Sequence, residues 1–123
     1  QERLRFIHVA GTNGKGSTAA MLAAIGQAAG LKTGLYTSPH LVHMRERIQI
    51  NGQPISGEAL EGFIRHSRSR IDQLRATYFE ALTAIAFTYF AEQKVDLAEL
   101  LFRAGHQRHD VLILADVHWY EEF

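Results

Sequence analysis

A glycine-rich segment near the start of the chain has the residue types that bind phosphate. It reads Gly-Thr-Asn-Gly-Lys-Gly-Ser-Thr over residues 11–18. Glycines let the backbone turn so that its N–H groups converge on an anion. A lysine among those donors can reach the β- and γ-phosphate oxygens of a nucleotide, and a following hydroxyl can bind Mg²⁺. The segment therefore predicts a triphosphate site made of Gly11, Thr12, Asn13, Gly14, Lys15, Gly16, Ser17 and Thr18.

The spacing of this segment departs from the standard phosphate loop. Val9 stands where that motif has its first glycine, and Gly16 follows the lysine where the motif has Ser or Thr. One alternative is an ordinary glycine-rich turn with an incidental lysine. We favour a variant phosphate loop, because Gly-Lys-Gly-Ser-Thr at a helix start serves no packing purpose.

The loop needs a strand before it and a helix after it, and the flanking residues supply both. Residues 6–10 form a short apolar run typical of a buried strand, 18–29 are rich in Ala as in a helix, and 34–36 begin a second strand. Strand, helix and strand at this spacing predict a βαβ unit and a parallel sheet. The fold class expected is α/β, with a mostly parallel sheet flanked by helices.

Further elements follow this unit along the chain. Asn51-Gly52 predicts a hairpin between residues 47–50 and 53–55, in which Pro54 restricts its strand to an edge. Ser56 and Thr77 are candidate caps of two helices, the second running to about Gln93. Two more strands are expected at residues 95–102 and 111–115. The hairpin is a small excursion from the main sheet.

Composition excludes several functional classes. The chain has 123 residues, enough for one domain, and its 13 Lys+Arg balance 13 Asp+Glu, so no overall positive field favours nucleic acid. The absence of Cys excludes disulfides and thiolate metal sites, and no apolar run is long enough to span a membrane. We expect a cytoplasmic protein that binds neither nucleic acid nor membrane. Because the first residue is Gln1, we also expect a longer parent chain.

Four blocks of the sequence together resemble one enzyme family. The blocks are the phosphate loop with its preceding His-Val-Ala, Tyr-Thr-Ser-Pro-His-Leu at 36–41, Glu-Arg-Ile with Ile-Asn-Gly at 46–52, and Thr-Tyr-Phe-Glu at 77–80. Their order and spacing are similar to those of folylpolyglutamate synthase and dihydrofolate synthase, a branch of the Mur ligase superfamily. The resemblance implies the variant P-loop NTPase-like fold of the Mur ligase central domain. It covers residues 6 to about 98.

The resemblance also implies roles for individual residues. ATP and Mg²⁺ would be the cofactors, with Lys15 as the catalytic residue and Ser17 and Ser38 as metal ligands. The substrate pocket for dihydropteroate or folate would be lined by Thr77, Tyr78, Phe79 and Glu80. Two structural alternatives stay open: Ser38 could be a turn residue before Pro39, and Thr77 with Glu80 could form only a helix capping box.

Beyond residue 98 the family pattern is lost. Leu101 stands where the family has an acidic Mg²⁺ ligand, and Glu99 lies two residues too early, about 6.6 Å away along a strand. We therefore divide the chain into a partial ATP-binding ligase domain, residues 1–98, and a divergent tail, 99–123, of the same single domain. The C-terminal domain of the family has no counterpart here.

The function expected is ATP-dependent addition of L-glutamate to dihydropteroate or to a folate glutamate tail, through an acyl phosphate. Two alternatives remain, a nucleotide-binding module without turnover and another P-loop enzyme such as a small-molecule kinase. The isolated chain is expected to be weakly active or inactive. Among other polar residues, His8 is expected in the core, and Arg45, Glu46 and Arg47 on a solvated face or mobile loop.

Overall fold

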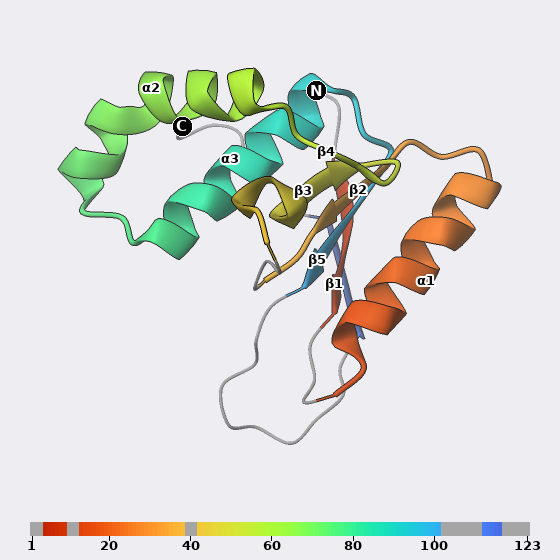
Figure 1. The fold of residues 1–123 in the computed structure, drawn as a ribbon. Helices are drawn as coiled ribbons and strands as arrows, with labels where there is room; N and C mark the ends of the chain where they lie inside the picture. The colour runs from red at the N-terminus through yellow and green to blue at the C-terminus, as the bar shows by residue number, and fades with distance from the viewer. Residues whose placement is uncertain (1–3, 10–12, 39–41, 102–111, 117–123) are drawn as a thin grey trace.

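The computed structural model describes residues 4–9, 13–38, 42–101 and 112–116. These residues form a six-stranded sheet with helices on both faces (Figure 1). The helices are α1 (Lys15–Ala28), the short 3₁₀ helix η1 (Met44–Arg47), α2 (Gly57–Leu74) and α3 (Tyr78–Glu92). The strands are β1 (Arg5–Val9), β2 (Thr33–Tyr36), β3 (Ile48–Ile50), β4 (Gln53–Pro54), β5 (Leu97–Leu101) and β6 (Leu112–Asp116).

Three parallel strands form the centre of the sheet. The strand order is β4-β3-β2-β5-β1-β6, and β5 pairs in parallel with both β1 and β2. The carboxyl ends of these strands therefore lie at one edge, where the segment before α1 and the segment after β2 both begin. The expected α/β fold is confirmed. The outer pairings are antiparallel, β6 with β1, β3 with β2 and β4 with β3, so the sheet as a whole is mixed.

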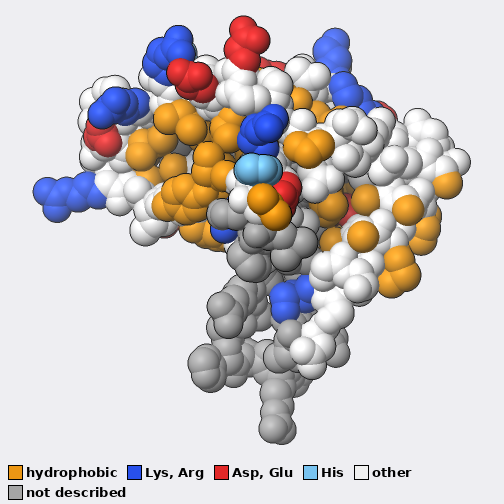
Figure 2. Space-filling view, viewed as in Figure 1, with side chains coloured by type: hydrophobic (Ala, Val, Ile, Leu, Met, Phe, Trp, Pro, Cys, Tyr) orange, Lys and Arg blue, Asp and Glu red, His pale blue; other side chains and the backbone are white. Residues whose placement is uncertain are grey.

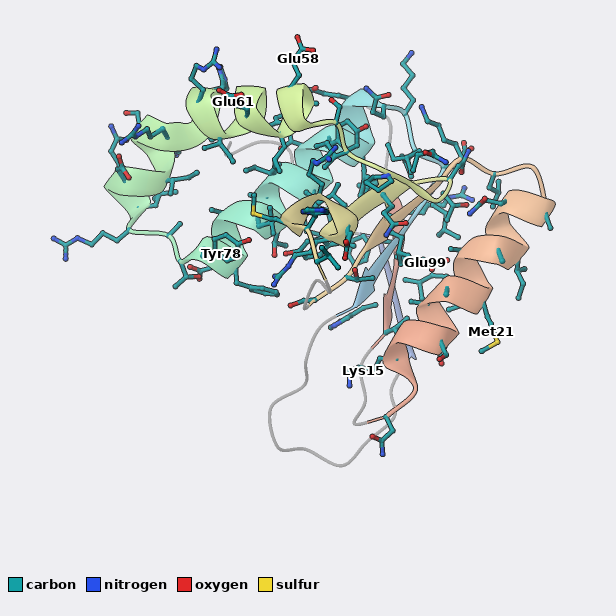
Figure 3. The ribbon with its side chains drawn as sticks, viewed as in Figure 1. Lys15, Met21, Glu58, Glu61, Tyr78 and Glu99 are labelled. Atoms are coloured by element: carbon teal, nitrogen blue, oxygen red, sulfur yellow. The ribbon has the colours of Figure 1, made fainter. Side chains whose placement is uncertain are left out.

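Among the described residues, α1 is the one helix on its face of the sheet (Figure 1). Its small residues Ala19 and Ala23 are buried, and Ala19 packs with Ile7 and Val9 of β1. Small side chains bring the helix close to the strands, so the start of α1 is held at the carboxyl edge. The outer face of α1 is also apolar, with Met21 and Ile25 exposed. Figure 2 shows hydrophobic side chains on this side of the molecule, and Figure 3 labels Met21 there.

The larger core lies on the opposite face, beneath α2 and α3. Tyr36, Ile48 and Phe90 are fully buried there. The ring of Phe90 packs directly on Gly34 of β2. The contact is so close that a Cβ added to Gly34 would lie 2.9 Å from the ring. This core fixes the start of α3 relative to the end of β2.

The hairpin turn and the two helix caps occur where the sequence predicts them. Asn51 and Gly52 both have positive φ, 47° and 76°, as a two-residue hairpin turn requires, and β4 is an edge strand. The Ser56 hydroxyl accepts a hydrogen bond from the Ala59 amide and caps α2, and Thr77 caps α3. Helix α1 begins three residues earlier than its Ala-rich run predicts.

The division at residue 98 stays a prediction, although β5 runs across it and β6 pairs with β1. Within the described residues, we find no helix with the length and apolar character needed to cross a bilayer.

Candidate nucleotide-binding site

The start of α1 presents backbone N–H groups rather than side-chain caps. Gly14 is the N-cap, with a left-handed conformation at φ 74°, and no side chain caps the helix. The first helical hydrogen bond runs from the Thr18 amide to the Gly14 carbonyl, 2.9 Å. The amides of the first turn precede that bond, and at the start of a helix such N–H groups point toward the space before it, where an anion can bind. The first turn has no acidic residue, so nothing in it offsets the positive end of the helix dipole.

Lys15 is the first residue of α1. Figure 3 shows its side chain leaving the first turn at the carboxyl edge of the sheet. Backbone amides, a helix dipole and an ammonium group thus lie together, which is the donor set of a phosphate site. Of the predicted loop residues, Asn13 to Thr18 are described; Gly11 and Thr12 lie outside the described residues.

Ser38 follows β2 at the same edge. Its Oγ accepts a hydrogen bond from Arg47 Nη1 at 3.4 Å, and the neighbouring Thr37 amide donates to the Arg47 carbonyl at 2.9 Å. Arg47 is the last residue of η1 and is only 8% exposed. The expectation that Arg47 lies on a solvated face or mobile loop is wrong. It precedes Ile48, whose burial holds the Arg47 backbone against the end of β2.

The start of α3 combines a complete capping box with two aromatic rings. The Glu80 carboxylate accepts hydrogen bonds from the amide and hydroxyl of Thr77, both at 2.8 Å, and the Glu80 amide donates to the Thr77 hydroxyl at 3.3 Å. These bonds, from the amide first and then the hydroxyl, lower the pKa of Glu80. Tyr78 and Phe79 remain partly exposed beside the cap.

Contacts among aromatic rings and one arginine connect the end of β2 with the start of α3. The residues are Tyr36, Arg47, Tyr78 and Phe79. Arg47 Cζ lies 5.7 Å from the centre of the Tyr78 ring, within the range of a cation–π contact. The Tyr36 and Phe79 rings are 6.3 Å apart, and the Thr83 hydroxyl donates to the Tyr36 hydroxyl at 3.3 Å. Burial is the main cause that raises the pKa of Tyr36, which stays a neutral phenol at physiological pH. The structure therefore brings Ser38 near the start of α3.

Glu99 lies beneath α1, away from the residues at the carboxyl edge (Figure 3). It is fully buried opposite Ile7 and Leu35, and neither carboxyl oxygen has a hydrogen-bond partner among the described residues. Burial raises its pKa to about 7, with a smaller opposing effect from the Ala23 backbone. The burial of Glu99 was not predicted. The signal for it was that Glu99 lies on the same face of this central strand as Leu97, which packs against the cluster beneath α1.

The donor set present here suits Mg²⁺ only when the metal arrives with phosphate oxygens. The predicted ligands Ser17 and Ser38 offer hydroxyls, whereas Mg²⁺ in proteins usually takes one or two carboxylates as well. Leu101, at the expected acidic position, ends β5, and Glu99 points to α1. No group of three or more His, Asp or Glu that could hold a metal occurs in the part of the chain that the structure describes.

His8 on β1 is half-buried, and burial lowers its pKa, so it is neutral at physiological pH. Its side chain belongs to the sheet rather than to the candidate site. His40 lies outside the described residues.

Comparison with known proteins finds one family repeatedly. The mitochondrial folylpolyglutamate synthase of Homo sapiens is 47% identical over 104 residues, which cover 79% of this chain and 18% of the human protein. The folylpolyglutamate synthase of Lacticaseibacillus casei is 44% identical over 124 residues, covering 95% of this chain and 29% of that protein. No family model matches the chain.

Solved structures give the same result. A folylpolyglutamate synthase from Thermotoga maritima superposes with a TM-score of 0.75 at 40% identity, over 80% of this chain and 25% of that one. A complex of folylpolyglutamate synthase with AMPPCP and folate superposes with a TM-score of 0.70 at 42% identity, over 85% and 27%. The chain thus spans between about a fifth and three tenths of the length of these proteins.

Proposed function

Because the chain belongs to the folylpolyglutamate synthase family, we propose that it binds ATP at the start of α1 and forms part of a ligase for glutamate. The ligase would add L-glutamate to dihydropteroate or to the glutamate tail of a folate. One observation carries the proposal: Gly14 opens the first turn of α1 in a left-handed conformation, with Lys15 beside it, at the carboxyl edge of three parallel strands. The relative with bound AMPPCP and folate supports it.

We assign the phosphate contacts to residues 11–18. The amides of the first turn and the Lys15 ammonium would bind the β- and γ-phosphates, as helix starts bind anions generally. Bound Mg²⁺ would neutralise phosphate charge, held by the Ser17 and Ser38 hydroxyls together with phosphate oxygens. Tyr78 and Phe79, with Thr77 and Glu80 behind them, would contact the flat ring system of the second substrate.

The proposed chemistry needs no protein nucleophile. A substrate carboxylate oxygen attacks the γ-phosphorus of ATP. The bond from the γ-phosphorus to the oxygen of the β-phosphate breaks, ADP departs, and the substrate becomes an acyl phosphate. The amine of glutamate then attacks the acyl carbon, the bond from that carbon to the phosphate oxygen breaks, phosphate departs with the electron pair of this C–O bond, and the nitrogen releases a proton to form the amide. Lys15 and the α1 amides would stabilise the charge that develops on the phosphoryl oxygens.

A second candidate is a nucleotide-binding module without turnover. Leu101 at the end of β5, with Glu99 turned beneath α1, favours it, because the metal site then lacks a carboxylate. We propose that this chain alone turns over weakly or not at all, and that the remainder of a family enzyme supplies the rest of the site. Location in the cytoplasm stays a prediction.

The test combines binding with turnover on the full 123-residue chain. Calorimetry should detect ATP binding in Mg²⁺, and the chain given ATP, dihydropteroate and glutamate together should release little or no phosphate. Failure to bind ATP would refute the nucleotide site. Rapid phosphate release that requires glutamate would refute the inactive-chain proposal, whereas a stable phosphorylated product that accumulates over many turnovers without glutamate would indicate a kinase.

A further inference from the structure

Arg47 is a charged residue in a buried place, and such a charge persists only when surrounding groups compensate it. Two of the groups around it come from different segments. Its Nη1 donates to Ser38 Oγ at 3.4 Å, and its Cζ lies 5.7 Å from the centre of the Tyr78 ring. Ser38 follows β2, whereas Tyr78 begins α3, so one guanidinium contacts residues 40 positions apart in the sequence.

The backbone of Arg47 is fixed as firmly as its side chain. Its carbonyl accepts from the Thr37 amide at 2.9 Å, and the next residue, Ile48, is fully buried and pairs with Tyr36 in the sheet. The guanidinium therefore extends from a rigid base at the end of β2. Tyr78, by contrast, is 56% exposed and is the first residue of its helix, so its ring needs a partner to hold one orientation.

We propose that Arg47 is a positioning residue that holds the Ser38 hydroxyl and the Tyr78 ring in a fixed relation. This inference rests on the proposed function, in which Ser38 binds metal with the nucleotide and Tyr78 contacts the second substrate. Arg47 itself touches neither. Its Nη1 donates to Ser38 Oγ, a hydroxyl oxygen whose second lone pair can bind a cation, and its Cζ lies over the Tyr78 ring.

The geometry requires arginine rather than any cation. A planar guanidinium can stack on a ring and donate a hydrogen bond at its edge at the same time. A lysine ammonium is a compact point charge, so Arg47→Lys keeps the charge but loses one of the two contacts. Arg45 provides the matched control, because it lies on the same 3₁₀ helix and is exposed.

The first experiment uses the full chain without ligands. In Arg47→Lys, we expect the NMR signals of the Ser38 amide and the Tyr78 ring to move together, while circular dichroism shows an unchanged fold. Arg45→Lys should move neither signal. If Arg47→Lys folds and either signal stays in place, the positioning role is refuted, whether or not the chain binds ATP.

The second experiment measures binding of ATP, with Mg²⁺ and with EDTA, and of dihydropteroate. Arg47→Lys should reduce the gain in ATP affinity that Mg²⁺ provides, and should weaken dihydropteroate binding, each by about 5- to 10-fold. A general loss of stability would not change the Mg²⁺ dependence selectively. Loss of only one of the two effects would overturn the proposal. Wild-type protein that binds neither ligand would refute the proposed function instead, since the ligand-free NMR result stands independently.

Discussion

Gly14 has a backbone conformation that decides what the start of α1 can bind. At φ 74° it lies in the left-handed region, where a side chain costs free energy even though a Cβ there would meet no atom within 4 Å. The turn directs the chain into α1 so that its first amides face the carboxyl edge. The glycine is therefore required by conformation and not by lack of space.

A pair of alanine substitutions tests this conclusion. Gly14→Ala should destabilise the fold by about 1–2 kcal/mol and weaken ATP binding, because the backbone must leave its left-handed conformation. Gly16→Ala should leave stability unchanged or raise it by up to about 1 kcal/mol, since Gly16 is helical and its Cβ would meet no atom within 4 Å. Thermal unfolding with ATP titration measures both. Equal loss of stability in the two variants would contradict the assignment of the turn.

At the scale of elements, α1 and the sheet enclose an acidic residue that has no compensating charge nearby among the described side chains. Lys15, at the far end, is the one charged residue of α1, and Ile7 and Leu35 flank Glu99 in the sheet. Burial disfavours the carboxylate, so Glu99 is protonated in the folded chain up to about pH 7 but ionises from about pH 4.5 when unfolded. The folded state thus binds the extra proton between these values.

The contribution of Glu99 to the stability of the fold should therefore fall as pH rises from about 4.5 to 7. Relative to Glu99→Gln, the wild type should lose roughly 2–4 kcal/mol over this interval and then level off. Urea unfolding of both proteins at several pH values measures the difference. Glu58→Gln, which removes an exposed carboxylate of α2, is the control for the loss of one negative charge. A constant difference between wild type and Glu99→Gln would show that Glu99 is not buried beneath α1.

The start of α3 has both a capping role and a proposed binding role. The cap of α2, Ser56, has only the first role, so comparing the two caps distinguishes capping from binding. Ser56→Ala and Thr77→Ala each remove a hydroxyl that accepts from a helix amide, so each should cost about 1 kcal/mol of stability. Only Thr77→Ala should also weaken dihydropteroate binding, because only α3 begins beside Ser38 and Arg47. Thermal unfolding and calorimetry distinguish the two effects. Equal dihydropteroate affinity in both variants would show that Thr77 caps α3 but has no role in binding the substrate.

At the scale of the whole molecule, local signals predicted the elements but not their order in the sheet. Asn51-Gly52, the two caps and the glycine-rich turn each act within a few residues, and the structure has each described one where the sequence indicates. The insertion of β5 between β1 and β2, and the antiparallel pairing of β6 with β1, depend on contacts distant in sequence that no local pattern encodes.

In the candidate site, too, the features set by neighbouring residues could be predicted, and those set by contacts distant in sequence could not. The start of α1 and the capping box at Thr77 could be predicted, because their chemistry lies in consecutive residues. The role of Arg47 could not, since its contacts with Ser38 and Tyr78 exist only after β2 and α3 have packed on a common core. The family comparisons agree with the sequence blocks, and the chain spans less than a third of those proteins.

Calorimetric titration of ATP in Mg²⁺ against wild type, Lys15→Ala and Lys94→Ala shows directly whether the start of α1 binds nucleotide phosphates. Lys94 precedes β5 at the opposite edge of the sheet, so its variant removes the same charge away from the site. We predict at least a 10-fold loss of affinity for Lys15→Ala, the loss of a charge-assisted contact, and less than a 2-fold change for Lys94→Ala. Equal ATP affinity in all three proteins would contradict the claim that the start of α1 binds nucleotide phosphates.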